Sequence, residues 1–467
     1  MKGEGGRTLV QGLGTLDVAF ITFNCLVGSA IFIAAGIVPR AAPSAWLILP
    51  LWIAGGALCL AGVATYSELG TMFPEAGGQY QYLKEAYGPL WGFLYGWTAF
   101  LVIQSGVIAY IAVAGADGLG RFWPALSSAR TLIEVPIGSA TWRIHGSQVG
   151  GALLIALITA INWFGLRAGA TLQNAIAAVK IAAVFAFVGF GLLATPTASS
   201  PWSEPLPPGP LWSMLAVGMI GVLWCFDGFY QAGFCASEIR DPARSLPRGM
   251  FLGTAGTILV YALLNVVYLR ALPPRALGEA PRVGEAAAAA LLGPGAGRLM
   301  SAAVLVSILG CLATVILTAA RIYLPMAQDG VFFRTLARIH PRYRTPAACL
   351  LAQAGWSIVL AFTGSYEQLG TYVLFATFLF HTANGCAVFV LRRARPDWPR
   401  PYRAWGYPLT PALFILVSLT FVGSTLSERP VESLWGLGIV ALGLPAYAWW
   451  RRLDASPRAA AKTAESG

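Results

Sequence analysis

Long apolar stretches dominate the pattern of hydrophobic and polar positions along this chain. Each is close to the ~20 residues that an α-helix needs to cross a bilayer, and polar or Pro- and Gly-containing segments separate them. Twelve such stretches are predicted, at about 15–36, 45–67, 90–114, 149–166, 171–194, 211–236, 249–270, 299–322, 346–363, 369–391, 408–425 and 433–450. The pattern therefore predicts an all-α integral membrane protein with twelve transmembrane helices.

The first apolar stretch contains a weak point in its middle, at Val27-Gly28-Ser29-Ala30-Ile31-Phe32. Glycine and serine rank low in helix propensity. In lipid, a backbone amide freed from a helix costs several kcal/mol unless protein, ligand or a water-filled cavity satisfies it. We therefore expect Gly28 to Ile31 to form an unwound hinge whose amides bind a substrate.

The sixth stretch contains a second weak point, within Gly221 to Phe229. Asp227-Gly228 is a turn signal, and irregular backbone at membrane depth is tolerated only where it lines protein or a cavity. An aspartate within a span is also costly. A kinked structural helix, with Asp227 capping its second half, is the alternative interpretation. Both interpretations predict a break in this helix.

The spacing of the two breaks predicts an internal repeat, because four unbroken segments follow each broken one. Five is odd, so the second set of five starts from the opposite side of the membrane. Such inverted repeats place a binding site near the midplane, at the repeat interface. We expect an N-terminal tail (1–14), two repeats (15–194 and 211–391), two additional helices (408–450) and a C-terminal tail (451–467).

The two breaks offer complementary helix ends. The half-helix that starts after Ala30 presents amides and the positive end of its dipole, which suit a carboxylate. The half-helix that ends near Leu223 and Trp224 presents carbonyls, which suit an ammonium. This pair of charges is that of an α-amino acid. Trp224 is large enough to close the path as a gate, although packing in the core is equally compatible with an indole.

Lys180 lies nine residues into the fifth apolar stretch. Lysines near helix ends often reach the membrane surface, but apolar residues flank this one on both sides. An intramembrane cation is by default a functional residue with a partner in the bundle interior. The fifth stretch itself contains no acidic residue to neutralise Lys180, so we expect its partner on another segment.

Composition and charge support a membrane protein and exclude other classes. The chain is 57% hydrophobic and 11% charged, against about 25% charged in soluble domains. With the N-terminus inside, 21 of the 31 Lys and Arg residues fall in inside loops and tails and 9 in outside loops. This bias places both termini in the cytoplasm, so the net charge of +11 sets topology and does not indicate a nucleic-acid partner. Only four basic residues are Lys, and the Arg, Ala, Gly and Pro bias is typical of GC-rich bacterial genomes, which predicts a bacterial cell membrane.

Neither cysteines nor histidines form a site pattern. All seven cysteines lie in apolar spans, which predicts no disulfide framework and no metal site. The three histidines are scattered, with only His381 in a span. We therefore expect no cofactor and no enzymatic activity.

The chain resembles the amino acid–polyamine–organocation superfamily, and within it the L-type amino acid transporter branch and its bacterial relatives. The first-segment motif at 27–32 is similar to the family's Gly-Ser-Gly-Ile-Phe. The resemblance covers nearly all of segments one to ten. Further stretches that are similar to family motifs are residues 224–229, 236–239, 241–248, 162–165, 173–174, 178–180 and 261–268.

The resemblance implies a five-plus-five inverted repeat, the LeuT-type fold, that works by alternating access. It implies that Lys180 replaces a sodium ion by tying segment five to carbonyls of segment one, with Ser307 of segment eight as a further member of that site. This substitution would make transport sodium-independent. Trp224 would be the aromatic gate. The implied substrate site comprises Val27, Gly28, Ser29, Ala30, Ile31, Leu223, Trp224, Cys225, Asp227 and Tyr261.

The sequence departs from the family in two places. Ala30 stands where the family usually has glycine, so its methyl group lies close to the substrate backbone. The loop between segments three and four has no cysteine, so we expect no disulfide-linked heavy chain.

These observations predict a secondary transporter of neutral L-amino acids, working by exchange or uniport. Proton-coupled symport stays open. A polyamine or other amine would need acidic residues in place of the carboxylate contact, and Asp227 and Glu68 are the evident intramembrane candidates. A membrane enzyme or nutrient receptor is the remaining class.

Overall fold

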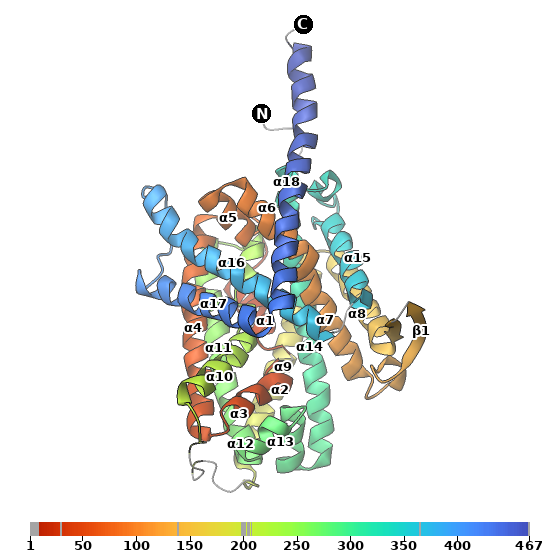
Figure 1. Ribbon diagram of the computed structural model, residues 1–467, viewed down its shortest axis with the longest axis vertical. Helices are drawn as coiled ribbons and strands as arrows, with labels where there is room; N and C mark the ends of the chain where they lie inside the picture. Colours follow the sequence, from red (N-terminus) through yellow and green to blue (C-terminus); the bar gives the residue numbers. More distant parts are fainter. Residues whose placement is uncertain are drawn as a thin grey trace.

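The computed structural model describes residues 9–28, 30–137, 140–197, 202, 206, 208–363 and 366–465. They form an elongated helical bundle (Figure 1). In the described part, nine helices are long and apolar enough to cross a membrane. These are α4 (Ala45–Met72), α6 to α7 (Pro89–Leu119), α8 (Gly146–Trp163), α9 (Leu166–Leu193), α11 (Pro242–Ala271), α14 (Pro294–Gln328), α16 (Tyr366–Ala394), α17 (Leu409–Glu428) and α18 (Pro430–Glu465). The prediction of a multi-span helical membrane protein is confirmed.

Shorter apolar helices coincide with the other predicted segments. α1 (Thr15–Leu26), α10 (Leu211–Cys225) and α15 (Ala347–Thr363) correspond to segments one, six and nine. The first two are short because each segment is broken. Helix length alone does not establish how many of these elements cross the membrane, so twelve crossings and the inverted repeat stay predictions.

Small elements complete the two broken segments and several connections. The first segment continues as α2 (Ala30–Ile33), η1 (Ala34–Gly36) and α3 (Ile37–Ala41), and the sixth as η4 (Gln231–Glu238). A π-helical turn, η2 (Ala99–Ile103), joins α6 (Pro89–Thr98) to α7 (Gln104–Leu119). The remaining small helices are α5 (Gln79–Tyr87), η3 (Pro124–Leu126), α12 (Pro274–Glu279), α13 (Val283–Leu292) and η5 (Arg334–Ala337).

The chain is helical as predicted, and one loop adds a short β-hairpin that was not predicted. β1 (Thr131–Ile137) and β2 (Ala140–His145) pair antiparallel between α7 and α8. Both strands carry β-branched or aromatic residues that favour a pleated surface. Glu134 lies opposite Arg143, with the guanidinium Nε 3.1 Å from the carboxylate. Trp142 Nε1 donates to the Phe362 carbonyl at 2.9 Å, which ties the hairpin to the end of α15.

Helix boundaries differ from the predicted ones where a turn lies inside an apolar run. Segments four and five were predicted at 149–166 and 171–194, whereas α8 ends at Trp163 and α9 begins at Leu166. Gly165 makes this turn with φ 129°, a conformation that glycine adopts readily. α12 and α13 were not predicted, and Pro274 at the start of α12 suits the first helical turn.

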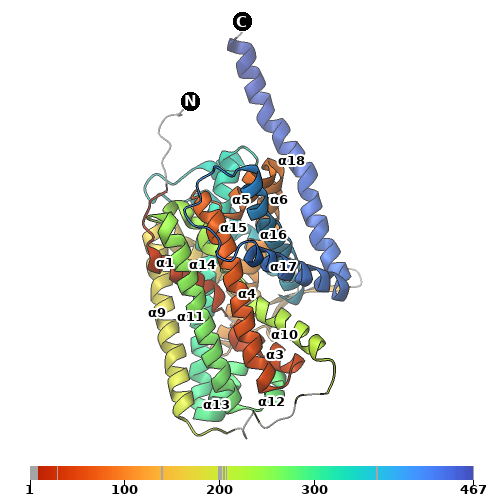
Figure 2. The same cartoon turned by 90° about the vertical axis from the view of Figure 1, so that its left-hand side faces the viewer.

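α14 lies at the centre of the bundle, and α17 and α18 lie at its edge. The apolar part of α14 is 72% buried, whereas that of α18 is 17% buried. Figure 2 shows α18 leaving the bundle at an angle. Both views place α5 and the C-terminal end of α18 at one end of the bundle, with α3, α12 and α13 at the other. The first of these ends is the one predicted to be cytoplasmic.

Candidate functional site

The first helix breaks within the predicted motif, but the predicted unwound hinge over Gly28 to Ile31 is wrong at its second half, because helix resumes at Ala30 and Ile31 is helical. α1 ends at Leu26, Val27 leaves helical geometry with φ −82° and ψ 69°, and α2 begins at Ala30. The Gly28 amide donates to the Leu26 carbonyl at 2.9 Å, so this amide, expected to be free for a substrate, has an internal partner. Ser29 and the side chain of Ala30 lie outside the described residues.

The sixth segment breaks after Cys225. The Phe226 amide donates to the carbonyls of Val222 and Leu223, both at 3.1 Å, and so terminates α10. Gly228 has φ 109°, and a Cβ there would lie 3.1 Å from Cys25 Cβ. Glycine therefore meets two needs at once: a left-handed backbone and a close approach to α1.

The carbonyls freed by the first break bind two side chains from other helices. Lys180 Nζ, from α9, donates to the Val27 carbonyl at 2.6 Å. Ser307 Oγ, from α14, lies 2.8 Å from the same carbonyl oxygen and 3.1 Å from that of Gly28. Both side chains are buried. A fixed ammonium thus lies against unwound carbonyls, the contact that the resemblance implies.

Tyr261 of α11 joins the two breaks. Its hydroxyl lies 2.6 Å from the Leu26 carbonyl and 3.0 Å from the Cys225 carbonyl. A tyrosine hydroxyl has one proton to donate, so it donates to one carbonyl while remaining within reach of the other. The ring is fully buried, 5.2 Å from the Trp52 ring and 4.9 Å from the Phe226 ring.

A cavity of about 110 Å³ lies between the two breaks. Four of the predicted site residues line it: Gly28, Trp224, Cys225 and Asp227. The other described ones do not: Val27, Ile31, Lys180, Ser307 and Tyr261 lie outside its wall, and Leu223 lines a smaller adjacent cavity of about 20 Å³. Trp224 is half-buried, a position compatible with the predicted gate.

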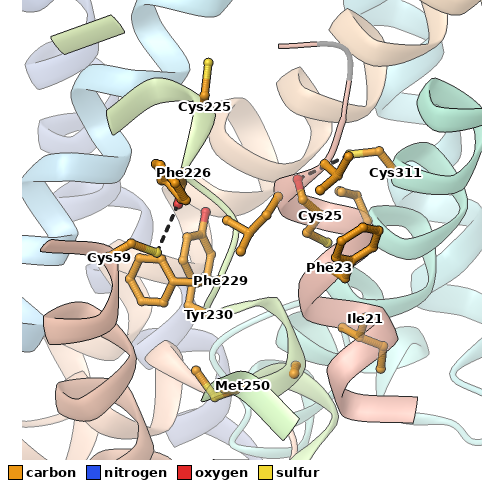
Figure 3. Packing of buried hydrophobic residues seen from close by; sticks show 14 of the residues in the cluster. Ile21, Phe23, Cys25, Cys59, Cys225, Phe226, Phe229, Tyr230, Met250 and Cys311 are labelled. Carbon is orange, nitrogen blue, oxygen red and sulfur yellow. Dashed lines mark hydrogen bonds between the residues drawn. The ribbon is translucent and has the colours of Figure 1, made fainter. Parts of the chain in front are cut away.

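Sequence reasoning missed much of the cavity wall. The missed residues come from α1, α7, the turn after α10, η4, α14 and α16, and are Cys25, Leu26, Val107, Tyr110, Ile111, Gly228, Tyr230, Gln231, Cys311, Val315, Val373 and Leu374. Figure 3 shows the Cys311 side chain beside the backbone of Cys25, with Cys311 Sγ 3.8 Å from the Cys25 carbonyl oxygen. Most of these residues are ordinary apolar residues, which no sequence signal separates from core packing.

Buried polar contacts surround Gln231, which lines the cavity. Gln231 Nε2 donates to Gln104 Oε1 at 3.0 Å, and Thr318 donates to Gln231 Oε1 at 2.9 Å. One turn farther along α14, Arg321 pairs with Glu238, with Nε 2.6 Å from Oε2 and both side chains buried. Removing one partner of such a buried pair is strongly destabilising, so this pair fixes η4 against α14.

Asp227 faces the cavity from the second break and has a partner behind it. Its Oδ1 lies 3.2 Å from His381 Nε2 on α16. The Asp227 side chain is 15% exposed and the His381 side chain 1%. Asp227 lines both the cavity of about 110 Å³ and the adjacent one of about 20 Å³, whereas His381 lines only the smaller of these two.

Comparison with known proteins gives one family and several relatives. Residues 13–441 match the sequence model of the family described as amino acid permease. The serine/threonine exchanger SteT of Bacillus subtilis (strain 168) is 27% identical, over 96% of this chain and 98% of that protein. The human large neutral amino acids transporter small subunit 2 is 27% identical, over 96% and 81%. The mouse b(0,+)-type amino acid transporter 1 is 26% identical, over 94% and 88%.

Proposed function

Because the chain belongs to the amino acid permease family, we propose that it is a secondary transporter that exchanges neutral L-amino acids across a cell membrane by alternating access. It is not an enzyme in this proposal. The observation that supports this proposal most strongly is that the two broken helices meet at one cavity. Beside it, Lys180 Nζ donates a hydrogen bond to the carbonyl of Val27.

The breaks supply the recognition of the amino acid's common atoms. The half-helix after the first break directs its positive end toward a carboxylate, and carbonyls at the end of α10 suit an ammonium. A carbonyl oxygen has two lone pairs, so the bond from the Asp227 amide to the carbonyl of Trp224, which lines the cavity, leaves one lone pair for a ligand. In this proposal the substrate region comprises Val27, Gly28, Ser29, Ala30, Ile31, Leu223, Trp224, Cys225, Asp227 and Tyr261, with Trp224 as gate. Gly28, Trp224, Cys225 and Asp227 are the members that line the cavity itself.

The Lys180 ammonium supplies a fixed positive charge where a bound sodium ion would otherwise satisfy unwound carbonyls. Ser307 completes this arrangement, and we propose sodium-independent transport on this basis. Exchange is favoured over proton symport and over amine transport because the relatives are named as amino acid exchangers and transporters.

The size of the cavity favours small substrates. A protein cavity of about 150 Å³ is sufficient for benzene, and this one is about 110 Å³. A small amino acid such as serine suits that volume, in agreement with the name of the Bacillus relative, a serine/threonine exchanger. The surrounding architecture in this proposal is a twelve-helix, inverted-repeat protein of a bacterial cell membrane, with both termini cytoplasmic and no disulfide-linked heavy chain.

Counterflow in proteoliposomes tests the proposal. Purified protein is reconstituted with millimolar unlabelled serine inside and labelled serine outside, in sodium-free buffer. We expect labelled serine to accumulate transiently in these vesicles. Control vesicles that contain no internal amino acid should accumulate far less labelled serine. Absence of counterflow across all twenty amino acids, with a monodisperse sample, would overturn the proposal.

A further inference from the structure

A line of buried polar side chains runs from the cavity wall into the protein behind it. Asp227 Oδ1 lies 3.2 Å from His381 Nε2, and His381 Nδ1 lies 2.6 Å from the Tyr66 hydroxyl on α4. The Tyr66 hydroxyl also lies 3.2 Å from Gln79 Oε1, which accepts a hydrogen bond from Asn384 Nδ2 at 2.9 Å. The line connects the second break to α4, α5 and α16.

The hydrogen bonds along this line have one arrangement in which every contact is used. His381 donates from Nε2 to Asp227 and from Nδ1 to the Tyr66 oxygen, and Tyr66 donates to Gln79. The imidazole is then a cation that neutralises the carboxylate. A neutral imidazole that donates from Nε2 keeps the bond to Asp227 and accepts from Tyr66. In either case one oxygen of Asp227 is held by His381.

The environment of His381 leaves Asp227 as its acidic partner. Aromatic rings surround the imidazole, with centroids at 4.9 Å for Tyr230, 5.4 Å for Phe378, 5.6 Å for Phe414 and 5.7 Å for Phe229. Rings on several sides fix the imidazole in place. A cation there is stabilised chiefly by the one carboxylate, and the carboxylate by the one imidazole.

This pairing matters because Asp227 is the only carboxylate among the described residues that line the cavity. A carboxylate without a partner is costly to bury and attracts a cationic substrate side chain as its counter-charge. His381 donates a hydrogen bond to that carboxylate whether the imidazole is neutral or charged. A cationic side chain therefore gains less from Asp227 than it would from a carboxylate without a donor.

We propose that His381 is a positioning residue that sets the charge preference of the substrate site. By holding Asp227 from behind the cavity, it makes the site one for neutral side chains. Removal of His381 leaves the same carboxylate at the cavity wall without its donor and favours amino acids with a cationic side chain. This inference rests on the proposed amino acid transport, and it adds a specificity determinant that does not itself touch the substrate.

The test compares two substrates of equal chain length, homoserine and 2,4-diaminobutyrate, which differ in a terminal hydroxyl or ammonium. Each competes against labelled serine in counterflow, and the ratio of their half-inhibitory concentrations is measured. For His381→Leu we expect the ratio to shift toward diaminobutyrate by roughly tenfold or more. The double variant His381→Leu/Asp227→Asn should lose that shift, because no carboxylate then remains at the cavity wall.

Thr382→Val is the matched control. Thr382 neighbours His381 on α16, donates its hydroxyl to the Phe378 carbonyl at 3.0 Å and does not line the cavity. The ratio of half-inhibitory concentrations for Thr382→Val should therefore equal that of the wild type. A folded His381→Leu protein that exchanges serine with the wild-type ratio overturns the inference. The same holds if the double variant keeps the shift.

A second variant covers the case in which His381→Leu does not fold. Tyr66→Phe keeps the ring and removes the hydroxyl at His381 Nδ1, so the ratio should move in the same direction by a smaller factor. An unchanged ratio in folded Tyr66→Phe overturns the inference. Failure of the proposed function is a separate result, because wild-type vesicles would then show no serine counterflow at all.

Discussion

The ammonium of Lys180 lies 2.6 Å from the carbonyl oxygen of Val27. This contact joins α9 to the end of α1, at the point where the helix hydrogen-bond ladder stops. A charged donor to a carbonyl is stronger than a neutral one, and the side chain is buried. The break in α1 is therefore stabilised by a charge that belongs to the protein.

Replacing Lys180 should impair exchange more than folding. In Lys180→Ala the Val27 carbonyl keeps Ser307 but loses its cation, so we expect serine counterflow to slow by about tenfold or more, equivalent to about 1.4 kcal/mol or more. Counterflow rates and gel-filtration profiles are measured together. Val179→Ala, at a neighbouring exposed position on α9, is the control and should exchange normally. Normal exchange in Lys180→Ala would return Lys180 to a packing role.

Tyr261→Phe should weaken the link between the two breaks. The change removes the hydroxyl that lies at 2.6 Å and 3.0 Å from the carbonyls of Leu26 and Cys225, while keeping the packed ring. Hydrogen bonds between membrane helices contribute about 0.6–1.7 kcal/mol, so we expect a lower melting temperature and slower exchange.

Tyr268→Phe is the comparison for Tyr261→Phe. It removes a longer contact, 3.4 Å from the Ile31 carbonyl, on the same helix. Its effect should be smaller than that of Tyr261→Phe. If the two variants lowered the melting temperature and the exchange rate equally, the Tyr261 hydroxyl would not be a specific link between the two breaks.

Gly228→Ala should destabilise the turn of the sixth segment. A side chain at φ 109° costs about 1–3 kcal/mol, and the new Cβ would lie 3.1 Å from Cys25 Cβ. We expect a clear drop in thermal stability and in counterflow. Gly423→Ala, in α17 with open space around the added atom, should keep both. A Gly228→Ala protein as stable as the wild type would contradict the described turn.

The breaks could be predicted because they rest on local chemistry. Gly28-Ser29 and Asp227-Gly228 are poor helix formers inside apolar runs, and lipid penalises such backbone wherever it occurs. Lys180 was visible as a lone cation among apolar residues. In each case, residues that are unfavourable in a lipid-spanning helix lie within a single apolar stretch, and this local signal indicates a functional position.

The partners of these residues could not be predicted, because they come from distant parts of the chain. Tyr261 reaches Leu26 across 235 positions, and His381 reaches Asp227 across 154. The sequence shows that His381 is the one histidine in a predicted span. Its pairing with Asp227 depends on tertiary packing, which the sequence pattern does not reveal. The hairpin of β1 and β2 was missed because the surrounding apolar helices dominate the sequence pattern.

If the two breaks together recognise a zwitterion, binding should require both the carboxylate and the ammonium of the ligand. Thermal stabilisation of the detergent-purified protein is measured with serine, with serinamide, which lacks the carboxylate, and with glycerate, which lacks the ammonium. A ligand at a hundred times its Kd stabilises the folded state by about 2.7 kcal/mol. We predict that serine raises the melting temperature and that neither analogue does so at the same concentration. Equal stabilisation by serinamide or glycerate would contradict the account.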